Sequence, residues 1–237
     1  MRIIDMHCHV LPALDDGAKS VKEAVAALQE AKKQGIDEII LTPHHYPDTD
    51  LPVDLIFQTK EILEEMIQQY NIGIKLYQGQ ECFYHTELPE LLDRGEVLTL
   101  AGSKYVLIEF PEDVSFREIK YGIRQLKEAG YEPILAHYER YRSLMEKGRV
   151  AELKSEEILL QMNFDTVQRE YGFLKRNPFH EDLKKGYVDF MASDCHGMKY
   201  RKYFIEPSVK WMEQNLPADS LERILFENPK KILEHIY

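Results

Sequence analysis

Short runs of apolar and β-branched residues alternate with amphipathic stretches along almost the whole chain. The apolar runs predict strands, and the stretches with helical periodicity predict helices between them. The expected strands are residues 2–6, 37–41, 74–80, 105–110, 132–136, 158–163 and 187–192. The expected helices are residues 20–34, 54–70, 88–94, 115–130 and 165–175, and a tail helix that begins at Asn228 and Pro229. This alternation is typical of a mainly parallel α/β fold.

About seven strand–helix units follow one another, and no repeat or linker interrupts them. Parallel strands that are each followed by a helix can close into a barrel. Because the units fall short of eight, we expect a distorted (β/α)7 TIM-like barrel. Barrels of this size fold as one unit, so we expect a single domain over residues 1–237. Ser20 with Glu23 and Ser115 with Glu118 have the spacing of capping boxes and predict two of the helix starts.

Composition narrows the class of protein. The formal net charge of −11 argues against non-specific binding to nucleic acid. It is compatible with a phosphorylated substrate, because bound divalent cations reverse the local charge. The three cysteines, Cys8, Cys82 and Cys195, cannot all pair and form no CxxC motif, so a disulfide scaffold is not expected. No apolar run has the length of a signal peptide or a membrane span, and we expect a cytoplasmic protein without membrane insertion.

Residues that can bind metal stand at successive strand ends. In a parallel α/β barrel the carboxyl ends of the strands form the face that holds the active site. The residues at these positions are His7, His44, Glu81, Glu109, His137 and Asp194. Six such residues at six successive strand ends are hard to obtain by chance, although each alone could be an ordinary core, surface or capping residue. The series therefore predicts a metal site.

Two short motifs extend this set. In His7-Cys8-His9 the two imidazoles point the same way from an extended segment and can reach one ion. Asp5 has the same parity and could orient a ligand from behind. In Asp194-Cys195-His196 a carboxylate and an imidazole are again two residues apart.

Other residues suggest what the metal would act on. Glu81 and Glu109 are candidate bridging carboxylates, and Glu109 lies in an apolar run where an unpaired charge would be costly. Arg140, three residues after His137, could bind phosphate oxygens through its planar guanidinium group, or form a surface ion pair. His45 is a further candidate phosphate contact.

Cys195 and Arg201 support a competing hypothesis. Their Cys-x5-Arg spacing after a strand matches the pattern of cysteine-dependent tyrosine phosphatases, in which a thiolate attacks phosphorus. The intervening residues hold one glycine, and no Ser or Thr follows the arginine. This hypothesis also leaves the six strand-end residues unexplained.

An ordered set of motifs resembles one known family. The segments are Asp5-Met-His-Cys-His9, Asp15-Asp16-Gly17, Thr42-Pro-His44-His45, Gly79-Gln-Glu81, Ile108-Glu109, Ala136-His-Tyr-Glu-Arg-Tyr141 and Ser193-Asp-Cys-His196. Together they resemble the PHP-type manganese-dependent protein-tyrosine phosphatases that occur with bacterial capsule and exopolysaccharide genes. The likeness spans nearly the whole chain.

The resemblance implies a PHP fold with three divalent metal ions. By matching motifs, His7, His9, Glu81 and Asp194 would hold the first ion. The second would be held by Glu81, Glu109 and His137, and the third by Asp16, His44 and His196. Arg140 and Arg201 match the arginines that bind substrate phosphate. Manganese is the expected metal, and iron or zinc would also suit ligands of this kind.

The resemblance also implies a substrate. The family acts on phosphotyrosines in the tail of a bacterial tyrosine kinase that regulates polysaccharide export. The expected mechanism is direct hydrolysis by a metal-bridging hydroxide, without a phosphoenzyme. The loop after His44, Tyr46-Pro-Asp-Thr-Asp50, departs from expectation because it is acidic. Alternatives are a PHP phosphoesterase for a small monoester such as histidinol phosphate, the Cys195/Arg201 phosphatase, and an inactive barrel that regulates a kinase.

Overall fold

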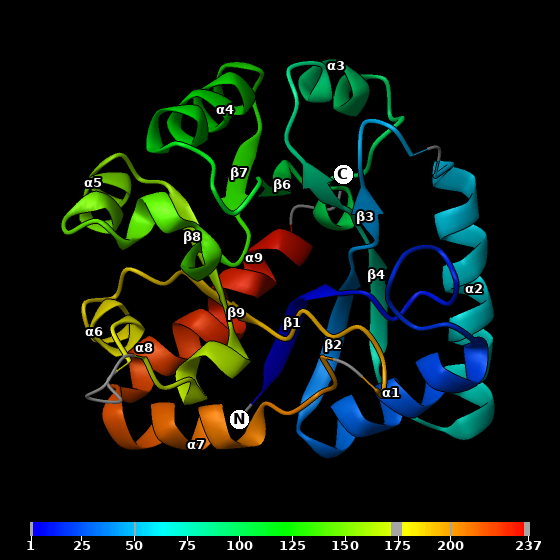
Figure 1. Ribbon diagram of the computed structural model, residues 1–237. Coiled ribbons are helices and arrows are strands. Elements are labelled where there is room, and N and C mark those ends of the chain that lie inside the picture. The colour runs from blue at the N-terminus through cyan, green and yellow to red at the C-terminus, as the bar shows by residue number, and fades with distance from the viewer. Residues whose placement is uncertain (1, 50, 172–176, 200, 235–237) are drawn as a thin grey trace.

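The computed structural model describes residues 2–49, 51–171, 177–199 and 201–234. Its strands form a curled parallel sheet with helices outside (Figure 1). The strands are β1 (Ile3–Cys8), β2 (Ile36–Leu41), β3 (His44–His45), β4 (Lys75–Gln78), β5 (Glu81–Phe83), β6 (Tyr105–Glu109), β7 (Glu132–Leu135), β8 (Leu159–Asn163) and β9 (Phe190–Ala192).

The helices alternate with these strands. They are α1 (Val21–Lys33), α2 (Val53–Tyr70), α3 (Leu88–Asp93), α4 (Phe116–Glu128), α5 (Arg149–Ser155), α6 (Phe179–Lys184), α7 (Glu206–Asn215), α8 (Ala218–Glu222) and α9 (Asn228–Glu234). Five 3-10 or π segments complete the described helical structure: η1 (Leu100–Gly102), η2 (Tyr138–Arg140), η3 (Arg142–Met145), η4 (Phe164–Gln168) and η5 (Arg223–Glu227).

The strands occupy seven positions around the sheet. One set pairs in the order β1-β2-β4 and the other in the order β3-β5-β6-β7-β8-β9, and every pairing is parallel. Because β3 continues the course of β2 and β5 that of β4, the two sets describe one wall. The wall closes where Cys8 bridges Cys195 in parallel and the amide of Asp194 donates to the carbonyl of His7 at 3.0 Å. The expected distorted (β/α)7 barrel is confirmed.

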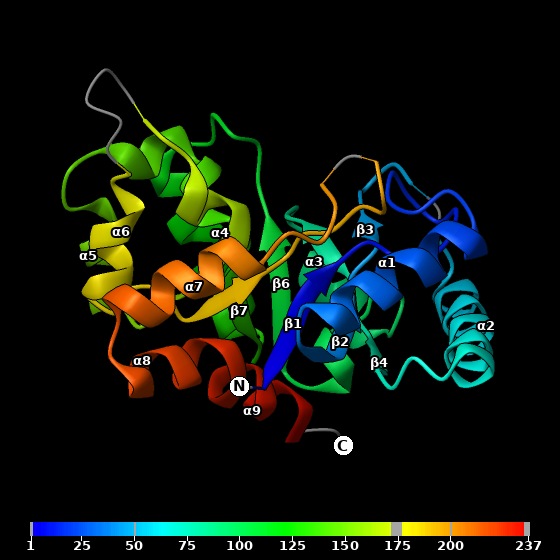
Figure 2. The same cartoon turned by 90° about the horizontal axis from the view of Figure 1, so that it is seen from below.

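Apolar side chains fill the barrel interior. Met6, Ile40, Leu107 and Ile134 come from the strands and are fully buried. Ile232 of α9 belongs to the same cluster and closes the end at which the strands begin. Figure 2 shows α9 beside the start of β1, with the strand arrows pointing away from it. The opposite face, where the strands end, is therefore left to polar side chains.

Several sequence predictions need correction. His44 and His45, expected in a loop, form the short strand β3, and Glu81 begins a separate strand instead of following a continuous one. Of the helix expected at 165–175, the described part is the 3-10 segment η4 and then non-helical chain; residues 172–176 lie outside the described residues. Asn228 does not cap a helix start, because its backbone is helical and follows η5 without a break.

The two predicted capping boxes differ. At Ser115 both reciprocal hydrogen bonds with Glu118 form. At Ser20 the hydroxyl accepts from the Glu23 amide, but the Glu23 carboxylate accepts from the amides of Lys19 and Met198. The helix start was predicted correctly, and the carboxylate instead ties α1 to the segment after β9.

Candidate metal centre

The strand ends and the loop after β1 bring the predicted ligands into one cluster, in which Asp16 is exposed and the other members are mostly buried. Each lies within 4.0 Å of another member through ring nitrogens or carboxylate oxygens. The members are His7, His9, Asp16, His44, Glu81, Glu109, His137, Asp194 and His196. We refer to these nine residues as the strand-end cluster. Three subsets have the spacing of metal ligands: His9 with Asp16, His44 and His196; His7 with His9 and Asp194; and His44 with Glu81 and Glu109.

Glu81 lies at the centre of the cluster. Its Oε2 is 3.2 Å from the Nε2 atoms of both His7 and His9, and 3.1 Å from Nδ1 of His44. Its Oε1 is 2.7 Å from Nε2 of His137. This carboxylate is buried and reaches four imidazoles, which come from β1, from the residue just after β1, from β3 and from the loop after β7. It therefore has the position of a bridging ligand.

Two side chains orient the imidazoles of β1 from behind. Oε1 of Gln161 lies 3.1 Å from Nδ1 of His7, and Oδ2 of Asp15 lies 2.8 Å from Nδ1 of His9. When Nδ1 donates to these oxygens, Nε2 keeps its lone pair for the centre. The two Nε2 atoms are 3.0 Å apart and face the same point. Sequence reasoning assigned neither Gln161 nor Asp15 this role; the only signal was the position of Asp15 in the Asp15-Asp16-Gly17 motif.

Asp5 does not orient an imidazole, although its parity suggested this. Its carboxylate accepts hydrogen bonds from the hydroxyls of Ser193 at 2.5 Å and Tyr203 at 3.0 Å. It thus holds the end of β9 against β1. The effect on the ligands is indirect, because Asp194 follows Ser193.

Gly17 explains how the acidic motif reaches the cluster. A Cβ atom at this position would lie 1.9 Å from the carbonyl oxygen of His9. Only glycine lets the loop pack this closely against β1. Packed so, Asp16 places Oδ1 3.4 Å from Nε2 of His44 and 3.2 Å from Nε2 of His196.

Arg140 and Arg201 converge on Asp194. Oδ2 of Asp194 accepts from Nη2 of Arg140 at 2.5 Å and from Nη1 of Arg201 at 3.0 Å. It also accepts from Nδ2 of Asn163 at 2.9 Å. Oδ1 of Asp194 has no hydrogen-bond partner and lies 3.6 Å from the Nε2 atoms of His7 and His9. The carboxylate thus presents one oxygen to the centre and the other to the two guanidinium groups.

The backbone is strained at this site. His137, Asp194 and Arg201 have positive φ angles of 31°, 50° and 27°. Such conformations are costly for residues other than glycine and collect at functional sites, where packing holds them. The strain falls on members of the strand-end cluster and on one of the two arginines.

Buried polar atoms without partners test whether the cluster suits metal ions. Six such atoms belong to it: His44 Nδ1, Glu81 Oε2, Glu109 Oε1, His137 Nδ1, Asp194 Oδ1 and His196 Nε2. Several lie within ion-pair distance of one another, but none has the geometry of a hydrogen bond. Leaving buried polar atoms unpaired is costly. Imidazole nitrogens and carboxylate oxygens that converge in this way fit divalent cations.

Neighbouring charged groups in the cluster shift one another's pKa values. Burial alone would raise the pKa of Glu81, but the nearby imidazoles, His7 first, lower it well below its usual value. Burial likewise opposes a low pKa for Asp194, and His7 and Arg140 lower it nevertheless. Burial lowers the pKa of His9, yet the hydrogen bond with Asp15 and the nearby carboxylate of Glu81 raise it to about 9. Negative carboxylates therefore draw positive charge into the centre, as protons or as metal ions.

The geometry disfavours Cys195 as a nucleophile. Its side chain is fully buried, and its sulfur lies 3.6 Å from the carbonyl oxygen of Gly197. Arg201 is directed to Asp194 and Asp16. A thiolate nucleophile needs an accessible, electropositive setting. His45, expected near the phosphate, lies on the other side of β3, with its ring 5.7 Å from that of His85.

Comparison with known proteins places the chain in a family. Residues 3–234 match the family described as capsular polysaccharide synthesis, CpsB/CapC. The chain belongs to the CpsB/CapC family. The resemblance inferred from the motifs is thereby confirmed at the level of the family.

Named relatives of the CpsB/CapC family match along their whole length. Tyrosine-protein phosphatase CpsB of Streptococcus agalactiae serotype III is 28% identical over 99% of this chain and 100% of its own. Tyrosine-protein phosphatase YwqE of Bacillus subtilis is 29% identical over 98% of this chain and 92% of its own. A solved structure from work on YwqE of B. subtilis and CpsB of Streptococcus pneumoniae, described as unique metal-dependent tyrosine phosphatases, matches with a TM-score of 0.89 and 28% identity, and covers 99% of this chain and 96% of that one.

No helix in the described parts of the chain is both long enough and apolar enough to cross a membrane.

Proposed function

We propose that this chain is a metal-dependent protein-tyrosine phosphatase that hydrolyses phosphotyrosine in proteins. The observation that carries the proposal is the strand-end cluster with Arg140 and Arg201 at its edge. Members of the same family that match the whole chain are named tyrosine-protein phosphatases, which supports the choice of substrate.

We propose that the strand-end cluster holds three divalent ions, with manganese as the first candidate and iron or zinc as alternatives. His7, His9, Glu81 and Asp194 would hold one ion, Glu109 and His137 with Glu81 a second, and Asp16, His44 and His196 a third. His9 and His44 each belong to two of the spatial subsets, so either imidazole could serve one of two neighbouring ions. Bound ions would neutralise phosphate charge and lower the pKa of a water molecule that attacks phosphorus.

The chain's own residues bind and orient the phosphate. The guanidinium groups of Arg140 and Arg201 supply planar pairs of N–H donors beside Asp194, where phosphate oxygens would lie. Both arginines now donate to Oδ2 of Asp194, which fixes them before substrate arrives. Phenolate is a far better leaving group than an alkoxide, so a separate general acid is not required.

We propose that the substrate protein in the cell is the phosphorylated tail of a tyrosine kinase that regulates capsule or exopolysaccharide synthesis, and that the reaction takes place in the cytoplasm. The family description, capsular polysaccharide synthesis, supports the link to this process.

Chelation tests the proposal. Purified protein is assayed on a phosphotyrosyl peptide before EDTA treatment, after it, and after Mn²⁺ is added back. Loss and recovery of hydrolysis are expected. Activity that ignores EDTA but disappears in Cys195→Ser would support the cysteine mechanism instead. Hydrolysis of histidinol phosphate with no hydrolysis of the peptide would make the chain a small-molecule phosphoesterase.

A further inference from the structure

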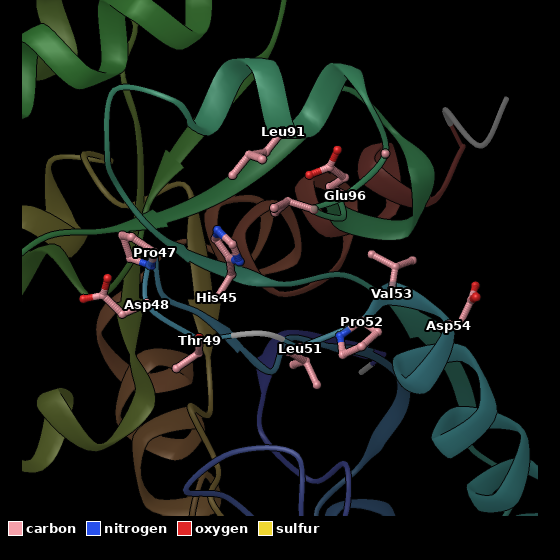
Figure 3. A pocket seen from close by; sticks show the side chains of 12 residues that line it. His45, Pro47, Asp48, Thr49, Leu51, Pro52, Val53, Asp54, Leu91 and Glu96 are labelled. Atoms are coloured by element: carbon pink, nitrogen blue, oxygen red, sulfur yellow. The ribbon is translucent and has the colours of Figure 1, made fainter.

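A second polar feature lies beside the strand-end cluster and takes no part in it. The loop after β3 and the start of α2 face α3 and the turn after it across a pocket of about 600 Å³ (Figure 3). The lining includes His45, Asp48 and Asp54 on one side and Leu91 and Glu96 on the other. We call this pocket the β3–α3 groove. Its acidic loop is the one that departs from the expected pattern after His44.

The imidazole of His45 is a buried polar group that faces the β3–α3 groove. The residue is 9% exposed, and its Nε2 is buried and has no hydrogen-bond partner among the residues that the structure describes. Figure 3 shows the imidazole directed into the pocket toward the side that carries Leu91. A buried polar atom without a partner is costly unless a ligand completes it. The groove is therefore built to receive a polar group.

The charged side chains that line the groove indicate the charge of the group that it would bind. Asp48 and Asp54 are exposed, and neither forms an ion pair with any residue that the structure describes. Glu96, the third carboxylate, is bound by the guanidinium of Arg94, with Nε 2.6 Å from Oε1. Figure 3 shows Asp48 and Asp54 at opposite ends of the groove, with His45 between them. Two exposed carboxylates and an imidazole along one groove favour a cationic occupant.

The apolar walls of the groove favour an occupant with a long side chain. Leu51, Val53, Leu91 and Val97 line it between the polar groups. Lysine and arginine have methylene stems that pack on apolar surface while their charged heads reach carboxylates. A bare metal ion or a small amine would leave these apolar walls without a partner. The groove thus matches a basic side chain on an extended peptide.

The groove adjoins the place where phosphotyrosine would bind. His44 and His45 are neighbours in β3, so their side chains point to opposite faces. His44 reaches the strand-end cluster, and His45 reaches the groove. Tyr46 stacks on His44 with ring centroids 5.0 Å apart and leads directly into the acidic loop. A peptide leaving the cluster along this edge would meet the groove within a few residues.

We propose that the β3–α3 groove is a specificity subsite that binds a lysine or arginine close in sequence to the phosphotyrosine of the substrate. This inference rests on the proposed phosphatase function. It makes substrate choice depend on Asp48 and Asp54, which lie outside the strand-end cluster.

A scan with synthetic phosphopeptides tests the subsite. One lysine is moved through the four positions on either side of phosphotyrosine in a Gly/Ser peptide, and norleucine replaces it in the matched neutral series. At the best position, lysine is expected to raise kcat/KM about two- to fivefold over norleucine in the Mn²⁺-loaded protein, the range for an exposed ion pair. The ratio should fall toward one in Asp48→Asn/Asp54→Asn and at high salt.

A control variant removes the same charge elsewhere. Glu61→Gln/Glu65→Gln changes two exposed carboxylates of α2 that do not line the groove, and it should keep the lysine preference. Equal rates for lysine and norleucine peptides at every position would overturn the subsite and leave the phosphatase function standing. A lysine preference that survives in Asp48→Asn/Asp54→Asn would overturn the assignment to this groove. Hydrolysis of no peptide at all would overturn the phosphatase function and the subsite with it.

Discussion

Gln161 and Asn163 of β8 connect three members of the strand-end cluster. Oε1 of Gln161 lies 3.1 Å from Nδ1 of His7 and accepts from the amide of His137 at 2.8 Å. Its Nε2 donates to Oδ1 of Asn163 at 2.8 Å, and Asn163 in turn donates to Asp194. One buried amide therefore fixes an imidazole, a strained backbone and, through its neighbour, a carboxylate.

Replacing Gln161 with leucine should weaken metal binding without removing any proposed ligand. Loss of a partner behind a ligand typically lowers metal affinity by about 10- to 100-fold. Titration of the metal-free protein with Mn²⁺ by calorimetry measures the change. Gln125→Leu, at a half-buried position of α4 outside the strand-end cluster, is the matched control and should bind as the wild type does. Wild-type affinity in Gln161→Leu would show that the amide does not orient His7 for metal.

His9 should release a proton when metal binds. Its pKa of about 9 means that the imidazole is protonated at pH 7 in the metal-free protein, whereas a ligand must be neutral. Metal affinity should therefore rise as the pH increases from 7 toward 9. Calorimetry in buffers of different ionisation enthalpy counts the protons released. If no protons are released at pH 7 and the affinity for metal does not depend on pH, a ligand role for His9 is contradicted.

The residue types of the site could be predicted from the sequence, but the contacts behind them could not. Six of the cluster residues are His, Asp or Glu at strand ends, a position that barrel geometry makes meaningful. Asp15 and Asp16 are adjacent carboxylates; the resemblance already grouped Asp16 with His44 and His196, where the structure places it, but nothing in the sequence indicated the contact of Asp15 with His9. Gln161 and Asn163 carry no spacing signature, because an amide on a buried strand is equally consistent with a satisfied core residue.

At the scale of elements, the second and third strand positions are each broken in two. β2 passes to β3 at Thr42 and Pro43, and β4 passes to β5 at Gly79 and Gln80. A Cβ atom at Gly79 would lie 3.0 Å from the Leu100 side chain and 3.2 Å from that of Ile40, so a larger residue at this break would require these side chains to shift. The sequence pattern stops at the first break, which is why His44 and His45 were expected in a loop, but it continues into the second, which is why a single strand was predicted at 74–80. The breaks shift the wall so that His44 and Glu81 pair directly.

Helix starts were predicted well where capping chemistry is local. Ser115→Ala should destabilise the fold by about 1 kcal/mol, because it removes the side-chain cap of α4. Ser115→Asp, which keeps an acceptor, should recover most of this loss. Urea unfolding measures both. Equal stability of Ser115→Ala and the wild type would show that α4 is held by packing alone.

The helix start predicted at Asn228 was wrong. Asn228-Pro229 has the sequence of a helix start, but the helical backbone continues into it from η5.

At the scale of the whole molecule, one centre joins charged side chains from distant parts of the chain. The chain carries a formal charge of −11, and four carboxylates belong to the strand-end cluster. In the absence of metal these carboxylates are balanced by protonated imidazoles and the two arginines. Divalent ions would replace the protons and hold β1, β5, β6 and the loops after β7 and β9 together, so metal binding and stability of the barrel should be coupled.

Metal removal should therefore lower the thermal stability of the folded chain. A ligand at 100 times its Kd stabilises a protein by about 2.7 kcal/mol, which for a chain of this size corresponds to roughly 5–10 °C in Tm. EDTA-treated protein should melt lower by this order, and Mn²⁺ should restore Tm in a concentration-dependent way. His7→Ala should melt at one temperature with or without Mn²⁺ if the ion that it helps to hold supplies most of the gain. A Tm that does not respond to EDTA or Mn²⁺ in the wild type would mean that the converging ligands are satisfied without metal, and the proposed function would lose its physical basis.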